Sequence, residues 1–144
     1  MKKIIFLVTS LFMISFAKAD TNISLKNYLD AKSIEDGKTQ IYLLNRCSAI
    51  YAYASAIILK TDAVSSKSFI EISNNLLFKS VELTIIEEEK KLEEVQKKAE
   101  EIRKELFNNY IIDGKKNWEK NKSHFKGSYI ANDMTICSKL TEEK

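Results

Sequence analysis

The sequence predicts an all-α fold, an elongated bundle of about four helices. Its 144 residues contain no proline and only three glycines, whereas a sandwich or barrel of short strands needs a turn signal roughly every 8–12 residues. Neither breaker occurs between Gly37 and Gly114, so most of this stretch is expected to be helical. With 44% hydrophobic and 30% charged residues, the composition is that of a globular chain.

The first nineteen residues have the pattern of a cleaved signal peptide. Lysines at positions 2 and 3 precede an apolar run over 4–17, and an Ala-Lys-Ala site follows at 17–19. The run is shorter than the roughly 20 residues that a membrane-spanning helix needs. We therefore predict a leader over 1–19 and a single helical domain over 20–144. The strong preference for lysine over arginine, with abundant isoleucine and asparagine, indicates an AT-rich genome and, together with this leader, a bacterial one. The mature protein is therefore expected to be periplasmic or secreted.

Removal of the leader leaves a chain with no net charge. The whole sequence has 23 basic and 20 acidic residues, and three of the lysines lie in the leader. A neutral chain has no overall field that attracts nucleic acid, so we exclude nucleic acid as a partner.

Two cysteines, Cys47 and Cys137, predict one disulfide. Exported proteins fold in an oxidising compartment, where paired cysteines are the rule. The alternative is a pair of buried thiols, and a redox pair is disfavoured because there is no C-x-x-C motif. His124 is the only histidine, and two cysteines with one histidine at these spacings match no zinc site. We predict no metal and no cofactor.

Residues 20–36 are expected to form a short helix or an arm before an Asp-Gly turn at 36–37. From about 39 to 60 an apolar stripe predicts a helix, and the few polar residues around it predict that this helix is buried at the centre of the bundle. A membrane span is the rival interpretation, which Asn45 and Arg46 disfavour. A ridge of small residues on the opposite face allows close approach of another backbone; it comprises Ser48, Ala52 and Ala56.

A second helix is expected to start near Ser68 and Glu71, which form a capping box. Its apolar seam alternates steps of three and four and is interrupted only by Glu88. Fourteen of the nineteen residues over 87–105 are charged, which predicts one long charged helix with a thin buried stripe or, alternatively, an oligomerising coiled coil. The stripe is Leu92, Val95, Ala99 and Ile102. A continuous helix over 66–110 would be about 68 Å long, so we expect either an elongated molecule or a break.

Asp113-Gly114 is expected to end the charged helix, and a last helix follows over 128–140. Cys137 shares an apolar face of that helix with Ile130 and Met134, so the disulfide would tie it to the central helix. Asp133 lies among apolar neighbours, which favours a half-buried, paired carboxylate over a catalytic one.

The segment 115–126 is the best candidate for contact with a partner, because it interleaves lysines with aromatic residues. On one helix, Trp118 and Phe125 would share a face beside Lys115 and Lys122. Such a face suits an anionic envelope component or an acidic protein. The alternative is that both rings pack inward and leave the lysines in solvent.

No catalytic or nucleotide-binding motif occurs in the chain. The leading hypothesis is a small non-enzymatic exported protein that acts through protein or envelope contacts. A second is a chaperone or inhibitor that uses the long helix as its binding surface, with a homo-oligomer through that helix also open. A third is a hydrolase with a Glu/Asp pair, for which the abundant carboxylates are an unspecific signal.

Overall fold

A computed structural model describes residues 22–142, and within this range the chain forms helices and no strand. The all-α prediction is confirmed, and a short first helix falls where a helix or an arm was expected. The signal peptide predicted for residues 1–19 lies outside the described residues. The helices are α1 (Leu25–Asp30), α2 (Gly37–Ile58), α3 (Ala63–Glu88), α4 (Leu92–Asn121) and α5 (Tyr129–Glu142).

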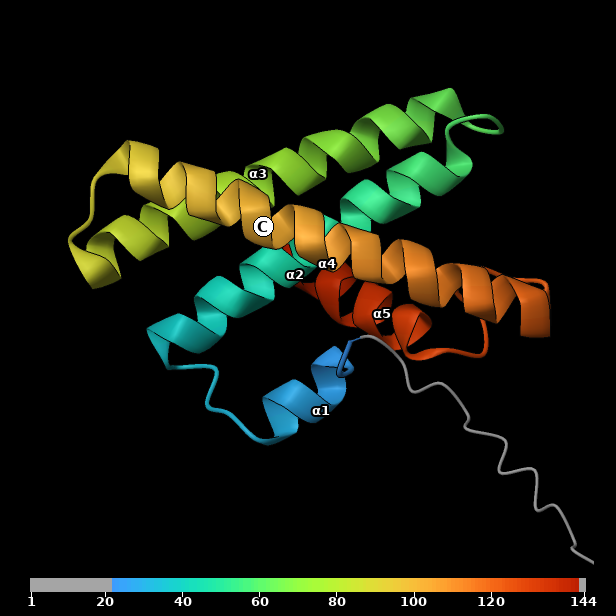
Figure 1. The fold of residues 1–144 in the computed structure, drawn as a ribbon, viewed down its shortest axis with the longest axis horizontal. Coiled ribbons are helices and arrows are strands. Elements are labelled where there is room, and N and C mark those ends of the chain that lie inside the picture. The colour runs from blue at the N-terminus through green and yellow to red at the C-terminus, as the bar shows by residue number, and fades with distance from the viewer. Residues whose placement is uncertain (1–21, 143–144) are drawn as a thin grey trace, which may run out of the picture.

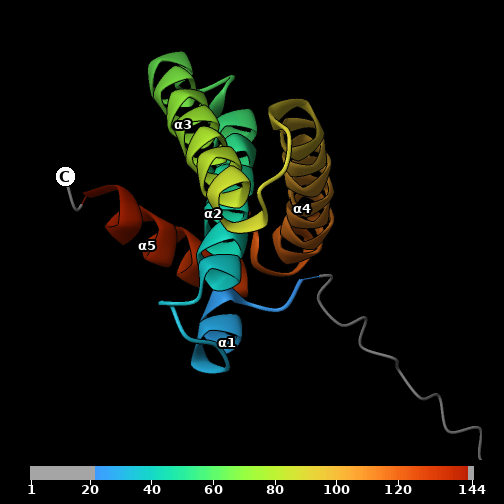
Figure 2. The same ribbon diagram turned by 90° about the vertical axis from the view of Figure 1, so that its left-hand side faces the viewer.

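The apolar helix α2 lies at the centre of an elongated bundle and contacts each of the other four helices. It pairs antiparallel with α3 along much of its length, and α4 crosses both of them (Figure 1). Seen from the end of the molecule, α3, α4, α5 and α1 surround α2 (Figure 2). The prediction of a buried central helix is therefore confirmed.

Polar side chains set the starts of the first three helices. The oxygens of Ser24, Asp36 and Asp62 each accept a hydrogen bond from the backbone N–H three residues later, which satisfies a donor that the helix leaves unpaired. The predicted capping box of Ser68 and Glu71 was wrong, because α3 already begins at Ala63. Asp62 caps α3 instead, because its carboxylate accepts hydrogen bonds from both the backbone N–H and the hydroxyl of Ser65.

The chain turns sharply between α3 and α4, so the long apolar seam does not form one helix. Glu89 adopts a left-handed conformation with φ of 50° and ends α3. Val81 of α3 then packs on Val95 and Ala99 of α4 in a small separate core. The sequence seam is thus two stripes that face each other across a hairpin. Burial of Leu92 was wrongly predicted, because its side chain is 55% exposed at the start of α4.

The helix α4 does not end at Gly114 as predicted but continues for seven more residues to Asn121. Gly114 lies inside the helix, where a Cβ would overlap the hydroxyl of Tyr53. This glycine therefore serves close packing between α2 and α4 rather than helix termination. The actual end is at Lys122, which has a left-handed backbone with φ of 54°.

Small polar residues bring α2 and α3 close together. Ser48 and Ser73 each donate a hydrogen bond to the carbonyl of the other, at 2.8 and 2.7 Å. Ser55 and Ser66 repeat the arrangement at 2.8 and 3.0 Å. The expectation of a close backbone approach at Ser48 is met, and the hydroxyls remain satisfied although all four residues are buried.

The predicted disulfide joins Cys47 of α2 to Cys137 of α5, with 5.3 Å between the Cα atoms. Both cysteines are fully buried. Because the bridge closes a loop of 90 residues, it stabilises the fold by about 4–5 kcal/mol on the chain-entropy estimate. A buried disulfide is typical of an oxidising, extracytoplasmic environment.

Among the helices of residues 22–142, α2 alone is long and apolar enough to cross a membrane by length and composition. In this fold it is the core helix of the bundle, with 61% of its most apolar window buried among the other helices. Its Arg46 side chain is buried and forms an ion pair with Asp133.

Two leucines in the α3–α4 hairpin provide a test of this packing. Leu77 is only 8% exposed and belongs to the small core, so Leu77→Ala should lower the free energy of unfolding by about 2–5 kcal/mol. Leu92→Ala should lower it by less than about 0.5 kcal/mol, as surface substitutions do. Urea unfolding followed by circular dichroism measures both values, and equal losses would contradict the hairpin.

Candidate functional site

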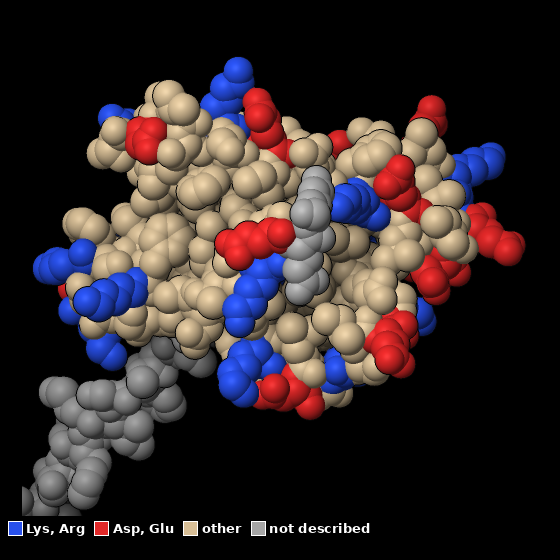
Figure 3. Space-filling model, turned by 180° about the vertical axis from the view of Figure 1, so that it is seen from behind, with Lys and Arg blue, Asp and Glu red and all other residues tan. Residues whose placement is uncertain are grey.

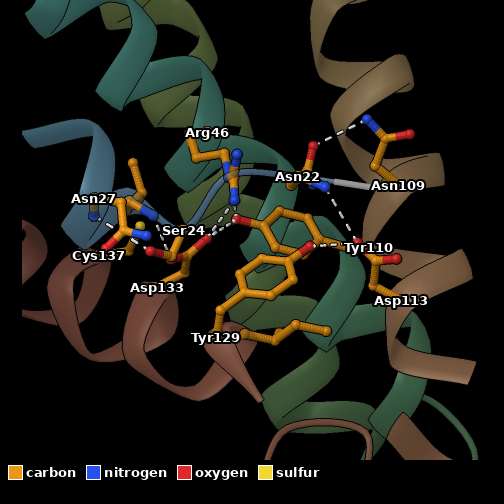
Figure 4. A network of polar contacts seen from close by, with 12 residues as sticks. Asn22, Ser24, Asn27, Arg46, Asn109, Tyr110, Asp113, Tyr129, Asp133 and Cys137 are labelled. Carbon is orange, nitrogen blue, oxygen red and sulfur yellow. Dashed lines mark hydrogen bonds and ion pairs between the residues drawn. The ribbon is translucent and has the colours of Figure 1, made fainter. Parts of the chain in front are cut away.

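A buried arginine organises the polar interior of the molecule. The guanidinium of Arg46 donates from Nε to the Tyr110 hydroxyl at 2.5 Å and from its terminal nitrogens to Tyr42 at 3.0 Å and Asp133 at 2.6 Å. It also lies over the rings of Tyr110 and Tyr129, 5.0 and 5.7 Å from their centroids. Figure 4 shows Arg46 of α2, Tyr110 of α4, and Tyr129 and Asp133 of α5 converging on one another.

Asp133 is the acceptor at the centre of this network. Besides Arg46, it accepts from the Tyr110 hydroxyl at 2.8 Å and from the backbone N–H of Leu25 at 2.7 Å. The latter is the first N–H of α1, a donor with no partner inside its own helix. The expectation that Asp133 is a paired carboxylate is therefore met, and the side chain is fully rather than half buried. One carboxylate joins α1, α2, α4 and α5.

The network shifts the pKa values of its members in directions that preserve it. Burial disfavours the charge on Arg46, but the contacts with Tyr110 and Asp133 outweigh burial and raise the pKa of the guanidinium. Burial raises the pKa of the Tyr110 hydroxyl well above its usual value. The Arg46 guanidinium therefore stays charged at neutral pH, and the Tyr110 hydroxyl between it and Asp133 stays protonated.

A second carboxylate, Asp113 of α4, extends the network toward the N-terminal arm. It accepts from the Tyr129 hydroxyl at 2.7 Å, from the backbone N–H of Asn22 at 3.3 Å and from Lys116 at 2.9 Å (Figure 4). Burial, followed by this contact with Asp113, raises the pKa of Tyr129. Together with the disulfide, the two carboxylates attach α1 and α5 to the α2–α4 pair. This interior is a structural core whose polar groups bind one another.

The surface offers a candidate binding site between α3 and α4. An apolar groove of about 300 Å³ runs along the first half of α4. Leu77 and Val81 form its floor, and the exposed side chains of Phe78 and Leu92 stand beside them. Its remaining lining is polar: Asn74, Gln96, Glu100 and Arg103.

A further apolar depression lies where α5 meets α2 and α3. It measures about 200 Å³ and is lined by Leu44, Ile72, Leu76 and Leu140, with polar atoms from Asn75, Lys79 and Thr141. Leu44 and Leu140 also line an adjoining hollow of about 210 Å³. Leu44, Ile72 and Leu76 belong to the main core or pack against it, while Ile34 and Leu140 are 56% and 37% exposed at the rim of the two hollows. In the α3–α4 groove, Phe78 and Leu92 are 61% and 55% exposed.

The structure separates the four residues predicted to contact a partner. Lys115 and Trp118 lie on α4, Lys122 ends it, and Phe125 lies in the following loop. The expectation that Trp118 and Phe125 share a helical face is wrong, because the left-handed backbone at Lys122 ends the helix between them. Phe125 is half-buried against the main core, while Trp118 is 47% exposed and stacks on His124 with 4.9 Å between ring centroids.

No group of three or more His, Cys, Asp or Glu side chains over residues 22–142 is arranged to hold a metal ion. Two polar contacts of the interior were not predicted from the sequence: the pairing of Arg46 with Asp133 and the serine face of α3. The role of Arg46 as the partner of Asp133 has no local pattern. The heptad spacing of Ser66, Ser73 and Ser80, in contrast, could have predicted the polar face that α3 turns toward α2.

No protein-family model matches the chain, and comparisons with curated proteins and with solved structures found no match either.

A double-mutant cycle tests the buried ion pair. Arg46→Met leaves the Asp133 carboxylate unpaired and Asp133→Asn leaves the guanidinium unpaired, so each should cost about 3–5 kcal/mol of the free energy of unfolding. The double variant has neither charge and should cost less than the sum by more than about 1 kcal/mol. Additive losses in urea unfolding would show that the two side chains do not depend on each other.

Alkaline pH should unfold the protein through its buried tyrosines. Burial raises the pKa of Tyr53 to about 12, and Tyr110 and Tyr129 are also shifted upward, against about 10 in an unfolded chain. The unfolded chain therefore loses these protons first, so the free energy of unfolding falls as pH rises from about 10 through 12. Urea unfolding across this range, with tyrosinate absorbance, measures the effect.

The variant Tyr53→Phe removes one of these groups and should make the pH dependence shallower. Titration of all six tyrosines near pH 10 without loss of helical signal would contradict the buried network.

Proposed function

We propose that this chain is an exported, non-enzymatic helical protein that acts by binding another protein, and that the α3–α4 groove is the binding surface. The observation that carries the proposal is the pair of exposed apolar side chains, Phe78 of α3 and Leu92 of α4, beside an apolar floor that α3 supplies. Exposed apolar residues that cluster at a hollow mark interaction sites more often than scattered ones do.

The occupant that fits this groove is an amphipathic helix of the partner. Two antiparallel helices form its walls, which is the arrangement that receives the apolar face of a third helix. Glu100 and Arg103 stand one turn apart on its α4 side and carry opposite charges. Arg103 is positioned by a hydrogen bond to Asn74 of α3 at 2.9 Å. A partner helix with a mixed-charge rim would complement both of these charges.

Export to the periplasm or the medium is supported by two independent features. The leader pattern over 1–19 directs the chain out of the cytoplasm, and the buried disulfide between Cys47 and Cys137 suits an oxidising compartment. Partner binding in that compartment corresponds to the chaperone or inhibitor role that a surface on the long helix implies.

Site-specific photocrosslinking from position 96, inside the groove, tests the proposal in exported material. The expected product joins position 96 to a peptide of another protein whose apolar residues recur at helical spacing. The variant Phe78→Gln with Leu92→Gln should abolish this product, because it removes both exposed apolar side chains without disturbing the core.

The matched control is Val64→Gln with Ile86→Gln, which replaces two apolar residues of α3 that lie outside the groove and are more exposed than Phe78 and Leu92. It should leave the product unchanged. Two results would overturn the proposal: equal loss in both variants, or a product in which position 96 joins a second copy of this chain. In the second case, sedimentation would show a dimer that the Phe78→Gln, Leu92→Gln variant dissociates.

A further inference from the structure

The C-terminal end of α4 is the most strongly basic part of the molecule. Residues 115–126 contain five lysines and one glutamate. Four of these lysines are exposed, and none of the four forms an ion pair with a described carboxylate. Lys116, the fifth, is paired with Asp113. We call the exposed group, with Trp118, the basic end: Lys115, Trp118, Lys120, Lys122 and Lys126.

Apolar side chains stand among these lysines on the outer surface of α4. Ile111, Lys115 and Trp118 follow one another at steps of four and three, so they share one side of the helix. Ile111 is 39% and Ile112 is 47% exposed. Stacking on His124 restrains the Trp118 ring, and His124 is itself hydrogen-bonded to the Tyr53 hydroxyl at 3.2 Å. His124 thus connects the exposed indole of Trp118 to the buried Tyr53.

We propose that the basic end binds the surface of a membrane that contains anionic phospholipids. Lysine ammonium groups pair with lipid phosphates, while tryptophan and isoleucine enter the boundary between headgroups and acyl chains. A patch that bound only a soluble anion would need the lysines but would gain nothing from exposed Trp118, Ile111 and Ile112. On α4, Ile111, Lys115 and Trp118 combine both kinds of side chain on one side of the helix, which favours a membrane.

The distribution of charge along the molecule orients it relative to an anionic membrane. The turn between α3 and α4 carries five glutamates and two lysines over residues 87–94, at the opposite end of α4. Figure 3 shows lysines gathered at one extremity, where α4 finishes, and glutamates concentrated toward the other. An anionic surface attracts the first end and repels the second, so the molecule would stand on the membrane with the α3–α4 groove directed away from it.

Vesicle binding by the protein without residues 1–19 tests the proposal, since an apolar leader would itself enter vesicles. The probes are vesicles of phosphatidylcholine alone and of equimolar phosphatidylglycerol and phosphatidylcholine. Trp118 is the only tryptophan, so its fluorescence reports directly on the basic end. We expect binding to the anionic vesicles only, with a shift of Trp118 emission to shorter wavelength and weaker binding at about 1 M salt, where charges are screened within about 3 Å.

The variant Lys115→Gln with Lys120→Gln should weaken binding about 25-fold, because each lysine near an anionic surface contributes about fivefold. The matched control, Lys97→Gln with Lys98→Gln, makes the same change of charge on exposed positions near the other end of α4 and should bind as the unmodified protein does. Circular dichroism verifies that both variants are folded.

Three results would overturn the proposal: equal weakening in both variants, equal binding to the two kinds of vesicle, or binding of inorganic polyphosphate without any response of Trp118 to vesicles. The last would assign the basic end to a soluble polyanion. None of these outcomes affects the α3–α4 groove, whose residues lie elsewhere on the hairpin.

Discussion

The buried ion pair between Arg46 and Asp133 joins α2 to α5, with 2.6 Å between the guanidinium nitrogen and the carboxylate oxygen. A guanidinium and a carboxylate taken out of water are costly unless every donor and acceptor finds a partner. Here the partners are supplied by Tyr42 and Tyr110 and by the first N–H of α1. Satisfying one buried charge therefore specifies how α1, α4 and α5 sit against α2, which apolar packing alone leaves loosely determined.

Two kinds of contact hold the outer helices against α2. Toward α4 and α5, the central helix presents Arg46 and Cys47, so polar geometry and a covalent bond set these contacts. Toward α3 it presents serines whose reciprocal hydrogen bonds require close backbones, for example Ser48 with Ser73. Because the other four helices surround α2, most of the exposed large apolar side chains lie on the outer helices α3 and α4, where the proposed partner groove is found.

The sequence predicted well what depends on composition and periodicity. The helical class, the buried central helix and the disulfide between Cys47 and Cys137 follow from apolar spacing and from the cysteine count. The sequence predicted poorly the helix ends, where contacts between helices override the local pattern. Gly114 resembles a helix end, yet it lies inside α4 because Tyr53 needs the space of a missing side chain. The apolar seam through Leu92 is regular enough for one helix, but folding it back at Glu89 buries Val81 against Val95 and Ala99 instead.

Native-state hydrogen exchange on the variant Cys47→Ser with Cys137→Ser measures how firmly the Arg46–Asp133 ion pair holds α5 without the disulfide. The disulfide and the Arg46–Asp133 network both attach α5 to α2, and removal of the first isolates the second. If the ion pair organises the fold, the backbone amides of α5 will remain protected nearly as strongly as those of α2, although the whole protein is less stable. Exchange of the α5 amides at the rate of an unstructured peptide, while α2, α3 and α4 stay protected, would show that the disulfide and not the ion pair holds α5 against α2.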